Sequence, residues 1–354
     1  MSDKYVVLIL DSQAETSIPF AQELGKIDTV VHAAAKYECL AFKSKYVSKA
    51  MVYPVVNSNN EFISWLKSLD RTYHYDLIIP LTENMLEVFQ HLDEDDLLRK
   101  KSFLASRKNL AVALDKMKTS LLALSLGIPV PNSVLLDESK SIDQPNSYPV
   151  VLKTLQSYIE IDGKNVYSPV CIASDLEERD RFIAKWLAYS PVQQQAYFHG
   201  EGWGVEFLYV GGVRVLHFCH QRIHELPLTG GASSYRRSVD APKAMLDAGT
   251  AILDQLNWHG LAMVEFKMNE KGEFVLLEIN PRPWGSLPLS VKAGVNFPVE
   301  MLRVAVGKNL AKQPRYQTNY YLRNFARDLD WTKENLLADS RDELLLTRNT
   351  FISI

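Results

Sequence analysis

Two carboxylates and one amide on the same face of a predicted hairpin are the residues best placed to do chemistry. Strands predicted at 261–268 and 273–280 are separated by a short turn and are expected to pair. Glu265 of the first strand would then share a face with Glu278 and Asn280 of the second. Carboxylate and amide oxygens are the ligands that Mg²⁺ prefers, and such an ion usually bridges to substrate phosphates. The pattern predicts a magnesium site, with a solvated sheet face as the alternative.

The second strand leads directly into a further candidate residue. Period-two alternation assigns Val275, Leu277 and Ile279 to the core side of that strand. Arg282 follows at the strand end, where a guanidinium can neutralise a transferring phosphoryl group or an acyl phosphate. The segment 281–286 that follows contains a tryptophan and two prolines, which restrict the backbone. Such a segment is unusual after a solvated sheet face and therefore favours a binding site.

The elements that position these residues fall into two patterns. The first 105 or so residues alternate short apolar runs with helical patterns, which predicts a parallel α/β sheet. The expected strands are 5–10, 28–34, 51–56, 76–81 and 102–106, with helices at 61–69 and 82–92. This part of the sequence contains no GxGxxG, so a dinucleotide site is not expected.

Closely spaced strands dominate the second pattern, which follows a helical segment at 107–131. Short turns between these strands indicate antiparallel pairing. The expected strands are 148–153, 167–173, 191–198, 203–210 and 213–219, followed by a helix at 242–256. The tail after Gly307 is interpreted as peripheral helix. We predict an N-terminal domain at 1–107, two further units at 108–193 and 194–310, and a C-terminal extension at 311–354.

Composition bounds the class of protein. The 354 residues are 47% apolar and 23% charged, as in globular proteins, and 39 basic against 42 acidic residues give a net charge of −3. This balance predicts binding to neither nucleic acid nor membrane. The three cysteines form no CxxC pair, which favours a reducing compartment. With no leader-like segment and no run of about 18 apolar residues, a cytoplasmic protein is expected.

The segment at 260–298 closely resembles the ATP-grasp signature, in particular that of members similar to the carbamoyl-phosphate synthase large chain. Further matches follow the family order: Thr82-Glu83 after a strand, Asp115-Lys116 before GIPVP, YPVVLK at 148–153 and GGASSYRRS at 230–238. The resemblance spans roughly residues 5–307. It implies an N-terminal parallel α/β domain and two α+β subdomains that clamp ATP between antiparallel sheets.

The resemblance also implies roles for particular residues. Lys116 and Lys153 would contact the ATP phosphates, although a surface lysine is the alternative for both from the residues alone. Arg282 would lie beside the γ-phosphate and the reacting carboxylate. The metal ligands implied are the same Glu265, Glu278 and Asn280.

The adenine site of this superfamily would correspond to the segment Gln194 to Phe198, including Gln195, Ala196 and Tyr197, with core packing of the two aromatic rings as the alternative. Glu201 would bind the ribose, and Glu206 is the other candidate. A glutamine replaces the glutamate that is usual in this hinge. The loop after Lys153 also lacks the glycines that let backbone amides surround phosphates.

A second cluster follows the strand at 213–219. His220, Arg222 and His224 alternate along the chain and lead into a glycine-rich segment with Arg236 and Arg237. We interpret that segment as a mobile loop that binds an anion, either the γ-phosphate or the carboxylate of the acceptor. Arg222 is assigned as a catalytic anion-binding residue, with a structural strand end or a metal site as the alternatives.

The function implied is that of a ligase. ATP and a carboxylate would give an acyl phosphate and ADP, and an amine or similar nucleophile would then attack the acyl group. The cofactors expected are ATP and Mg²⁺, with Mn²⁺ as a substitute, and the partners are small-molecule carboxylates and amines. A homodimer is compatible with the sequence. The alternatives are a non-catalytic ATP-binding scaffold and a carbamoyl-phosphate-type kinase unit.

Overall fold

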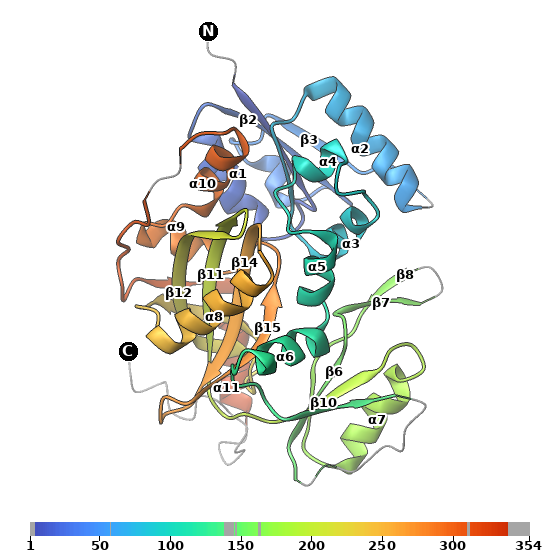
Figure 1. Cartoon of the computed structure of the whole chain (residues 1–354), viewed down its shortest axis with the longest axis vertical. Helices are drawn as coiled ribbons and strands as arrows, with labels where there is room; N and C mark the ends of the chain where they lie inside the picture. Colours follow the sequence, from blue (N-terminus) through green and yellow to red (C-terminus); the bar gives the residue numbers. More distant parts are fainter. Residues whose placement is uncertain are drawn as a thin grey trace.

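The structure is a computed structural model that describes residues 4–56, 58–137, 145, 147–161, 164–309 and 312–338. Figure 1 shows an N-terminal sheet, a central larger sheet and a smaller sheet at the opposite end of the molecule. None of the helices within these residues is long and apolar enough to cross a membrane.

The N-terminal sheet is parallel, as predicted, with the strand order β3-β2-β1-β4. Its strands are β1 (Tyr5–Leu10), β2 (Thr29–Ala35), β3 (Lys49–Val52) and β4 (Leu77–Pro80). The intervening helices are α1 (Ser17–Gly25), η1 (Leu40–Lys43), α2 (Asn59–Tyr73), α3 (Glu83–Gln90) and α4 (Leu97–Lys100). Apolar residues of α1 pack on one face of the sheet, and those of α2 and α3 pack on the other.

The start of α3 is fixed immediately after β4. The hydroxyl of Thr82 accepts a hydrogen bond from the backbone N–H of Met85 and so caps the helix. The predicted strand at 102–106 is wrong, because these residues form turn and coil. Phe103 has a φ of 52°, which is incompatible with an extended strand.

The smaller sheet is antiparallel and has the order β5-β10-β6-β9. Its strands are β5 (Ser133–Leu136), β6 (Val150–Thr154), β9 (Cys171–Ala173) and β10 (Val192–Ala196), and α7 (Leu176–Trp186) packs against them. Between β6 and β9 the chain forms a separate hairpin of β7 (Tyr158–Ile161) and β8 (Lys164–Tyr167). A continuous strand at 167–173 was therefore a wrong prediction.

The central sheet has six antiparallel strands in the order β15-β14-β11-β12-β13-β16. They are β11 (Glu201–Val210), β12 (Val213–Leu226), β13 (Ala232–Ser238), β14 (Gly260–Met268), β15 (Phe274–Asn280) and β16 (Tyr321–Arg323). The predicted hairpin is the pair β14 and β15.

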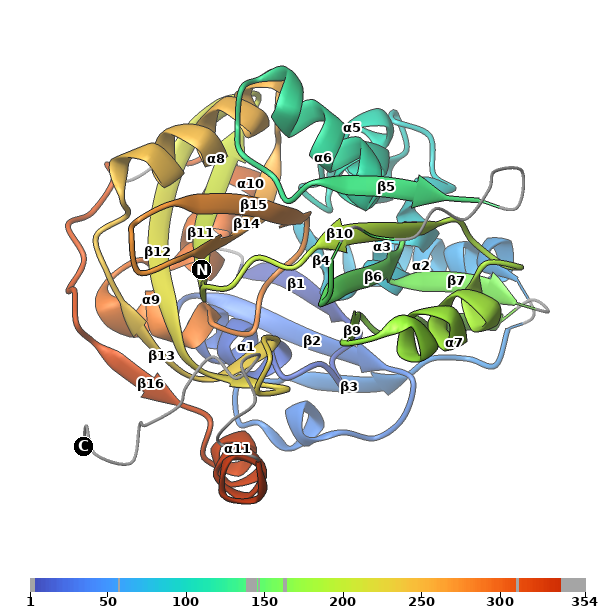
Figure 2. The ribbon, with the colours of Figure 1, turned by 90° about the horizontal axis from the view of Figure 1, so that it is seen from below.

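Both faces of the central sheet are covered. One face packs against α8 (Lys243–Gln255) together with α5 (Arg107–Ala113) and α6 (Lys116–Ser125). The other packs in part against the N-terminal sheet and against α9 (Leu287–Ala293) and α10 (Phe297–Ala305). Figure 2 shows α8 and the N-terminal sheet on opposite sides of the central sheet. The predicted domain boundaries stay a prediction, although α5 and α6, assigned to the unit at 108–193, pack against the central sheet.

The C-terminal segment is more than a peripheral helix. β16 extends the central sheet beside β13, and α11 (Phe325–Leu337) follows it and contacts both β12 and β13. The ring of Trp331 stacks on that of His224 with centroids 3.5 Å apart. Asp328 accepts hydrogen bonds from Nδ1 of His224 at 2.8 Å and from the hydroxyl of Ser234 at 2.9 Å. These contacts fix α11 against the sheet.

Candidate active site

A cavity of about 1010 Å³ lies where the three sheets meet. Its walls come from the N-terminal ends of α1 and α3, from β6, β10 and the β7–β8 hairpin, and from the exposed face of the central sheet. The beginning of α11 also contributes. A volume of this size is typical of sites that bind small molecules or cofactors.

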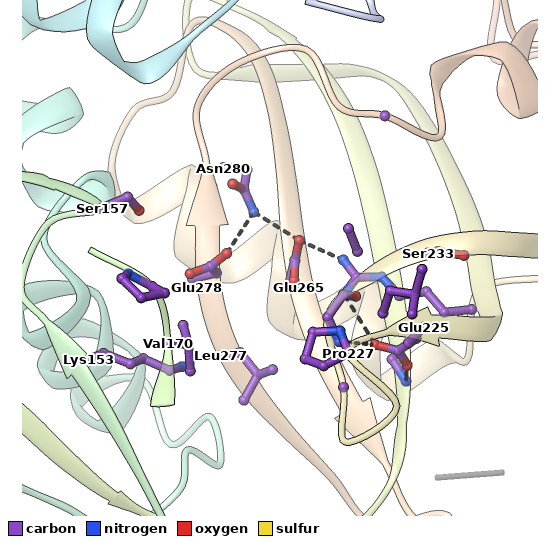
Figure 3. Close-up of a pocket in the computed structure, with 18 of the residues that line it drawn as sticks. Lys153, Ser157, Val170, Glu225, Pro227, Ser233, Glu265, Leu277, Glu278 and Asn280 are labelled. Atoms are coloured by element: carbon purple, nitrogen blue, oxygen red, sulfur yellow. Dashed lines mark hydrogen bonds and ion pairs between the residues drawn. The ribbon is translucent and has the colours of Figure 1, made fainter. Parts of the chain in front are cut away.

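The predicted metal ligands lie together on the cavity wall, as Figure 3 shows. Glu265 pairs directly with Glu278 across β14 and β15. The amide nitrogen of Asn280 lies 3.1 Å from Oε1 of Glu265 and 3.2 Å from Oε1 of Glu278. Burial raises the pKa of Glu265, and the neighbouring Glu278 raises it further, while Arg222 opposes the rise.

This group has the donor chemistry for Mg²⁺. Its carboxylate and amide oxygens are hard ligands, and a divalent cation would offset the repulsion between the two glutamates. Among the described residues, no group of three or more His, Cys, Asp or Glu side chains is arranged to hold a metal ion. Asn280, water or substrate phosphates would therefore have to supply the remaining ligands.

One prediction about this strand is wrong. The pairing register shifts between Glu265 and Phe266, so that Leu277 is an extra residue opposite this step. Leu277 consequently lines the cavity beside Glu278, and Leu276 takes its place in the core. The shift reverses the alternation that the sequence predicted for this part of β15.

Two buried lysines lie near the carboxylates, one on the smaller sheet and one on α6. Lys153 lies near the end of β6 and is 7% exposed, and Lys116 begins α6 and is 8% exposed. Nζ of Lys116 donates to the hydroxyl of Ser157 at 3.2 Å. Although burial alone would raise the pKa of Glu278, the two lysines lower it. Because both side chains are buried, Lys116 and Lys153 are not surface lysines.

The two predicted catalytic arginines also line the cavity. Nη2 of Arg222 lies 2.6 Å from Oε1 of Glu265, and its Nη1 donates to the carbonyl of Gly231 at 3.0 Å. Arg282 pairs instead with Glu83 at the start of α3, with 3.1 Å between Nη2 and Oε1. Both guanidiniums therefore already have a carboxylate partner within the protein.

Alternate glycines on β11 make room for this cluster. A Cβ on Gly202 would lie 2.7 Å from Cδ of Arg222, and one on Gly204 would lie 2.9 Å from Nδ1 of His220. Side chains from β12 therefore lie across β11 at both positions. This close approach explains the second and third glycines of the sequence HGEGWG.

Comparison with known proteins agrees with this architecture. Residues 217–327 match the model of a family described as ATP-grasp in the biosynthetic pathway with Ter operon. No curated protein matches the sequence. The structure of N5-carboxyaminoimidazole synthetase from Staphylococcus aureus superposes with a TM-score of 0.70 and 16% identity, covering 92% of this chain and 84% of that one. Residues 217–327 thus match an ATP-grasp family, and the chain has the ATP-grasp fold.

Two further structures share the ATP-grasp fold. The L-amino acid ligase from Bacillus licheniformis has a TM-score of 0.67 at 15% identity, with 88% of this chain and 76% of that one covered. The biotin carboxylase domain of 2-oxoglutarate carboxylase from Hydrogenobacter thermophilus, solved with MgADP and bicarbonate, has a TM-score of 0.67 at 16% identity over 89% and 73%. At such identities the likeness concerns the fold alone, which confirms the predicted fold class.

The predicted adenine hinge lies only partly at the cavity. Gln195, Ala196, Tyr197 and Phe198 line it, and Nε2 of Gln195 is buried without a hydrogen-bond partner among the described residues. The side chain of Gln194 points elsewhere, because its Oε1 accepts a 2.6 Å hydrogen bond from Arg179. Gln194 therefore offers no side-chain contact to a ligand in the cavity.

The two candidates for the ribose acid are both displaced from the cavity. Glu201 is exposed and pairs with Gln221, outside the residues that line the cavity. Glu206 is fully buried, and its Oε1 lies 2.6 Å from Nδ1 of His220 and 3.0 Å from the hydroxyl of Ser286. The geometry gives no support to a ribose contact by Glu201.

Sequence reasoning placed Arg236 in a mobile loop, whereas the structure places it on β13, opposite Arg222. Lys267 was not predicted as a site residue, and its Nζ lies 4.9 Å from the ring centre of Tyr197. Its position on β14, two residues after Glu265, could have indicated that it faces the same side. Tyr158 and Tyr167, which pair at the base of the β7–β8 hairpin, also line the cavity and were missed.

Proposed function

We propose that the chain is an ATP- and Mg²⁺-dependent ligase that activates a substrate carboxylate as an acyl phosphate and joins it to an amine. In this reaction the γ-phosphoryl group passes from ATP to a carboxylate oxygen, and the amine then attacks the acyl carbon and displaces phosphate. The observation that carries the proposal is the order of charges in the cavity. Two buried lysines lie near Glu278, and the guanidinium of Arg222 pairs with Glu265.

The chain's own residues would act as follows. Lys116 and Lys153 bind phosphate oxygens, and because both are buried their ammonium groups act in a medium of low dielectric. Glu265, Glu278 and Asn280 would hold Mg²⁺, which supplies positive charge to the phosphates when bound. The backbone after β10 and the free amide of Gln195 would contact the adenine edge.

Arg222 and Arg282 would stabilise the charge that moves during phosphoryl transfer. Arg222 is held by Glu265 and Arg282 by Glu83, so both guanidiniums are positioned before substrate arrives. The β7–β8 hairpin would cover the reacting groups and exclude water. Its tyrosine side chains replace the glycine-rich contacts expected at this position.

The proposal is tested by product analysis. The protein is incubated with MgATP and a panel of amino acids, dipeptides and small carboxylates, and ADP, AMP and phosphate are measured. A ligase of this type releases ADP and phosphate only when both substrates are present. Release of AMP would indicate adenylation, and ATP binding without turnover across the panel would favour the scaffold alternative.

A further inference from the structure

One guanidinium in the cavity has no carboxylate partner. Arg236 is 7% exposed and lines the cavity, yet no ion pair to it occurs in the described ranges of the chain. Its Nη1 donates to the carbonyl of Ser233 at 3.0 Å, and its Nε is buried with no hydrogen-bond partner among those residues. A buried charge left in this state is costly to the folded protein.

Other arginines of this chain show what a structural role looks like. Arg99 is 4% exposed, but its guanidinium bonds Glu94 and the carbonyls of Phe89 and Ala105 at 2.6–3.0 Å. Every part of that side chain is used within the fold. Arg236 lacks such partners although it is almost as deeply buried. A stabilising role in the fold therefore does not explain why an arginine occupies this position.

Its surroundings are positive. Burial, together with the nearby Arg222 and Arg327, lowers the pKa of Arg236 to about 10. Glu15 and Glu206 oppose this effect, but neither forms an ion pair with Arg236. Glu15 is held by Nε of Arg327 at 3.5 Å and by the amide of Asn324 at 3.4 Å. Glu206 bonds His220 and Ser286. The site therefore attracts an anion that the protein does not supply.

The position of Arg236 indicates which anion this is. Lys153 lies beside Glu278, Glu278 and Glu265 are joined through Asn280, and Arg222 lies on the far side of Glu265. Arg236 is the cross-strand neighbour of Arg222 and so lies beyond it. Figure 3 shows Lys153 and Ser233 on opposite sides of the glutamate pair. Arg236 is thus remote from the lysines proposed to hold the phosphates of ATP.

We propose that Arg236 binds a second, non-reacting carboxylate on one of the two substrates. The inference rests on the proposed ligase function and narrows its substrate class to compounds that keep a free carboxylate through the reaction. That carboxylate belongs either to the amine, which is then an amino acid, or to the acid, which is then a dicarboxylic acid. The guanidinium offers Nε and Nη2 side by side, which suits bidentate binding of a carboxylate.

The first test needs no known substrate. Arg236→Met removes an uncompensated buried charge, so it should raise the melting temperature by about 1–3 °C. Succinate, compared with sodium chloride at equal ionic strength, should raise the melting temperature of the wild type but not of Arg236→Met. The matched control is Arg237→Met, because Arg237 lies next in sequence, outside the cavity, and bonds Gln221 and Asn319. This control should keep the response to succinate.

The second test uses turnover. It uses a pair of substrates that gives ADP release with the wild type. In one arm, the carboxylate of the amino acid is replaced by a neutral amide. In the other arm, one carboxylate of the dicarboxylic acid is replaced in the same way. In the arm that removes the bound carboxylate, wild-type kcat/KM should fall by about tenfold to a hundredfold. In that arm, Arg236→Met should abolish the preference for the carboxylate over the amide, while Arg237→Met should retain this preference.

The outcomes separate the two proposals. A lower melting temperature for Arg236→Met, or equal stabilisation of both proteins by succinate, would overturn the assignment of Arg236. An unchanged preference for the carboxylate in the variant would do the same. Absence of ADP release by the wild type across the panel would count against the ligase, and the succinate test would still decide whether Arg236 binds a carboxylate.

Discussion

Arg282 and Glu83 form an ion pair across the cavity although 199 residues separate them in the chain. Arg282 follows β15 of the central sheet, and Glu83 is the first residue of α3 in the N-terminal unit. The ion pair therefore joins the central sheet to the N-terminal unit at the place where phosphoryl transfer is proposed. A substrate carboxylate or phosphate that reaches Arg282 has to compete with Glu83 for the guanidinium.

Replacement of Arg282 and of Lys153 should have different kinetic effects. Arg282→Met should lower kcat by about a hundredfold with little change in ATP affinity, because the guanidinium acts where charge develops. Lys153→Met should weaken ATP binding directly, because the ammonium contacts phosphates that are present before the reaction. Steady-state kinetics and ATP titration of both variants measure the difference. Equal small effects of Arg282→Met on both parameters would contradict the catalytic role.

Removal of one metal-binding charge should abolish turnover without unfolding the protein. Glu278→Gln keeps the size of the side chain but removes a carboxylate from the proposed Mg²⁺ site. MgATP should raise the melting temperature of the wild type, EDTA should remove most of that rise, and Glu278→Gln should show little of it. The control Glu273→Gln changes an exposed residue in the turn of the same hairpin. Equal turnover and an equal rise in melting temperature with MgATP for Glu273→Gln and Glu278→Gln would contradict the role of Glu278 as a metal ligand.

Gly204→Ala should destabilise the protein by about 1–3 kcal/mol. The added Cβ would meet the imidazole of His220, which is held by Glu206 and cannot move aside cheaply, and would lie 3.1 Å from the sulfur of Met263. Gly285→Ala is the control, because no heavy atom lies within 4 Å of the Cβ that it adds. Urea unfolding of the two variants measures the difference. A similar stability for both would show that the tight approach at β11 is not required.

Protonation of His224 should weaken the folded state at mildly acidic pH. Burial lowers its pKa from the ordinary 6.5, although the hydrogen bond to Asp328 opposes the shift. As the pH falls below about 6.5, the unfolded chain therefore takes up this proton before the folded chain does, and stability is lost. His224→Phe keeps a ring against Trp331 but cannot titrate, so its unfolding free energy should depend less on pH between 5 and 7.

The control for this comparison is His74→Asn, at an exposed position where a φ of 52° favours asparagine. It should keep the wild-type pH dependence. If His224→Phe and His74→Asn gave the same profile as the wild type, His224 would have no part in the acid sensitivity.

The sequence could predict those features that depend on regular local patterns. Strand alternation placed Glu265, Glu278 and Asn280 on one face correctly, because pairing is regular at those residues. It failed at Leu277, since one extra residue in β15 reverses the alternation and composition gives no sign of it. The segment with Arg236 was predicted as a mobile loop because of its glycines, yet the glycines form only the turn before β13.

Contacts between residues that are distant in the chain could not be predicted from the sequence. The assignment of Glu201 rested on spacing along the chain, and the structure pairs that side chain with Gln221 on β12 instead. Gln194 was expected at the cavity because neighbouring hinge residues are there, but a partner on α7 holds it on the opposite face. No pattern near residue 321 indicates that it joins a sheet edge more than 80 residues earlier in the chain.

That edge has a practical consequence for shortened forms of the protein. β16 pairs with residues 235–237 of β13 and forms one edge of the central sheet. A chain ending at Gly307 would keep the whole signature segment but leave the hydrogen-bonding groups of β13 open to other chains, which invites aggregation. It would also release the strand that carries Arg236 from one of its two neighbours. A minimal fragment for expression therefore has to extend through α11.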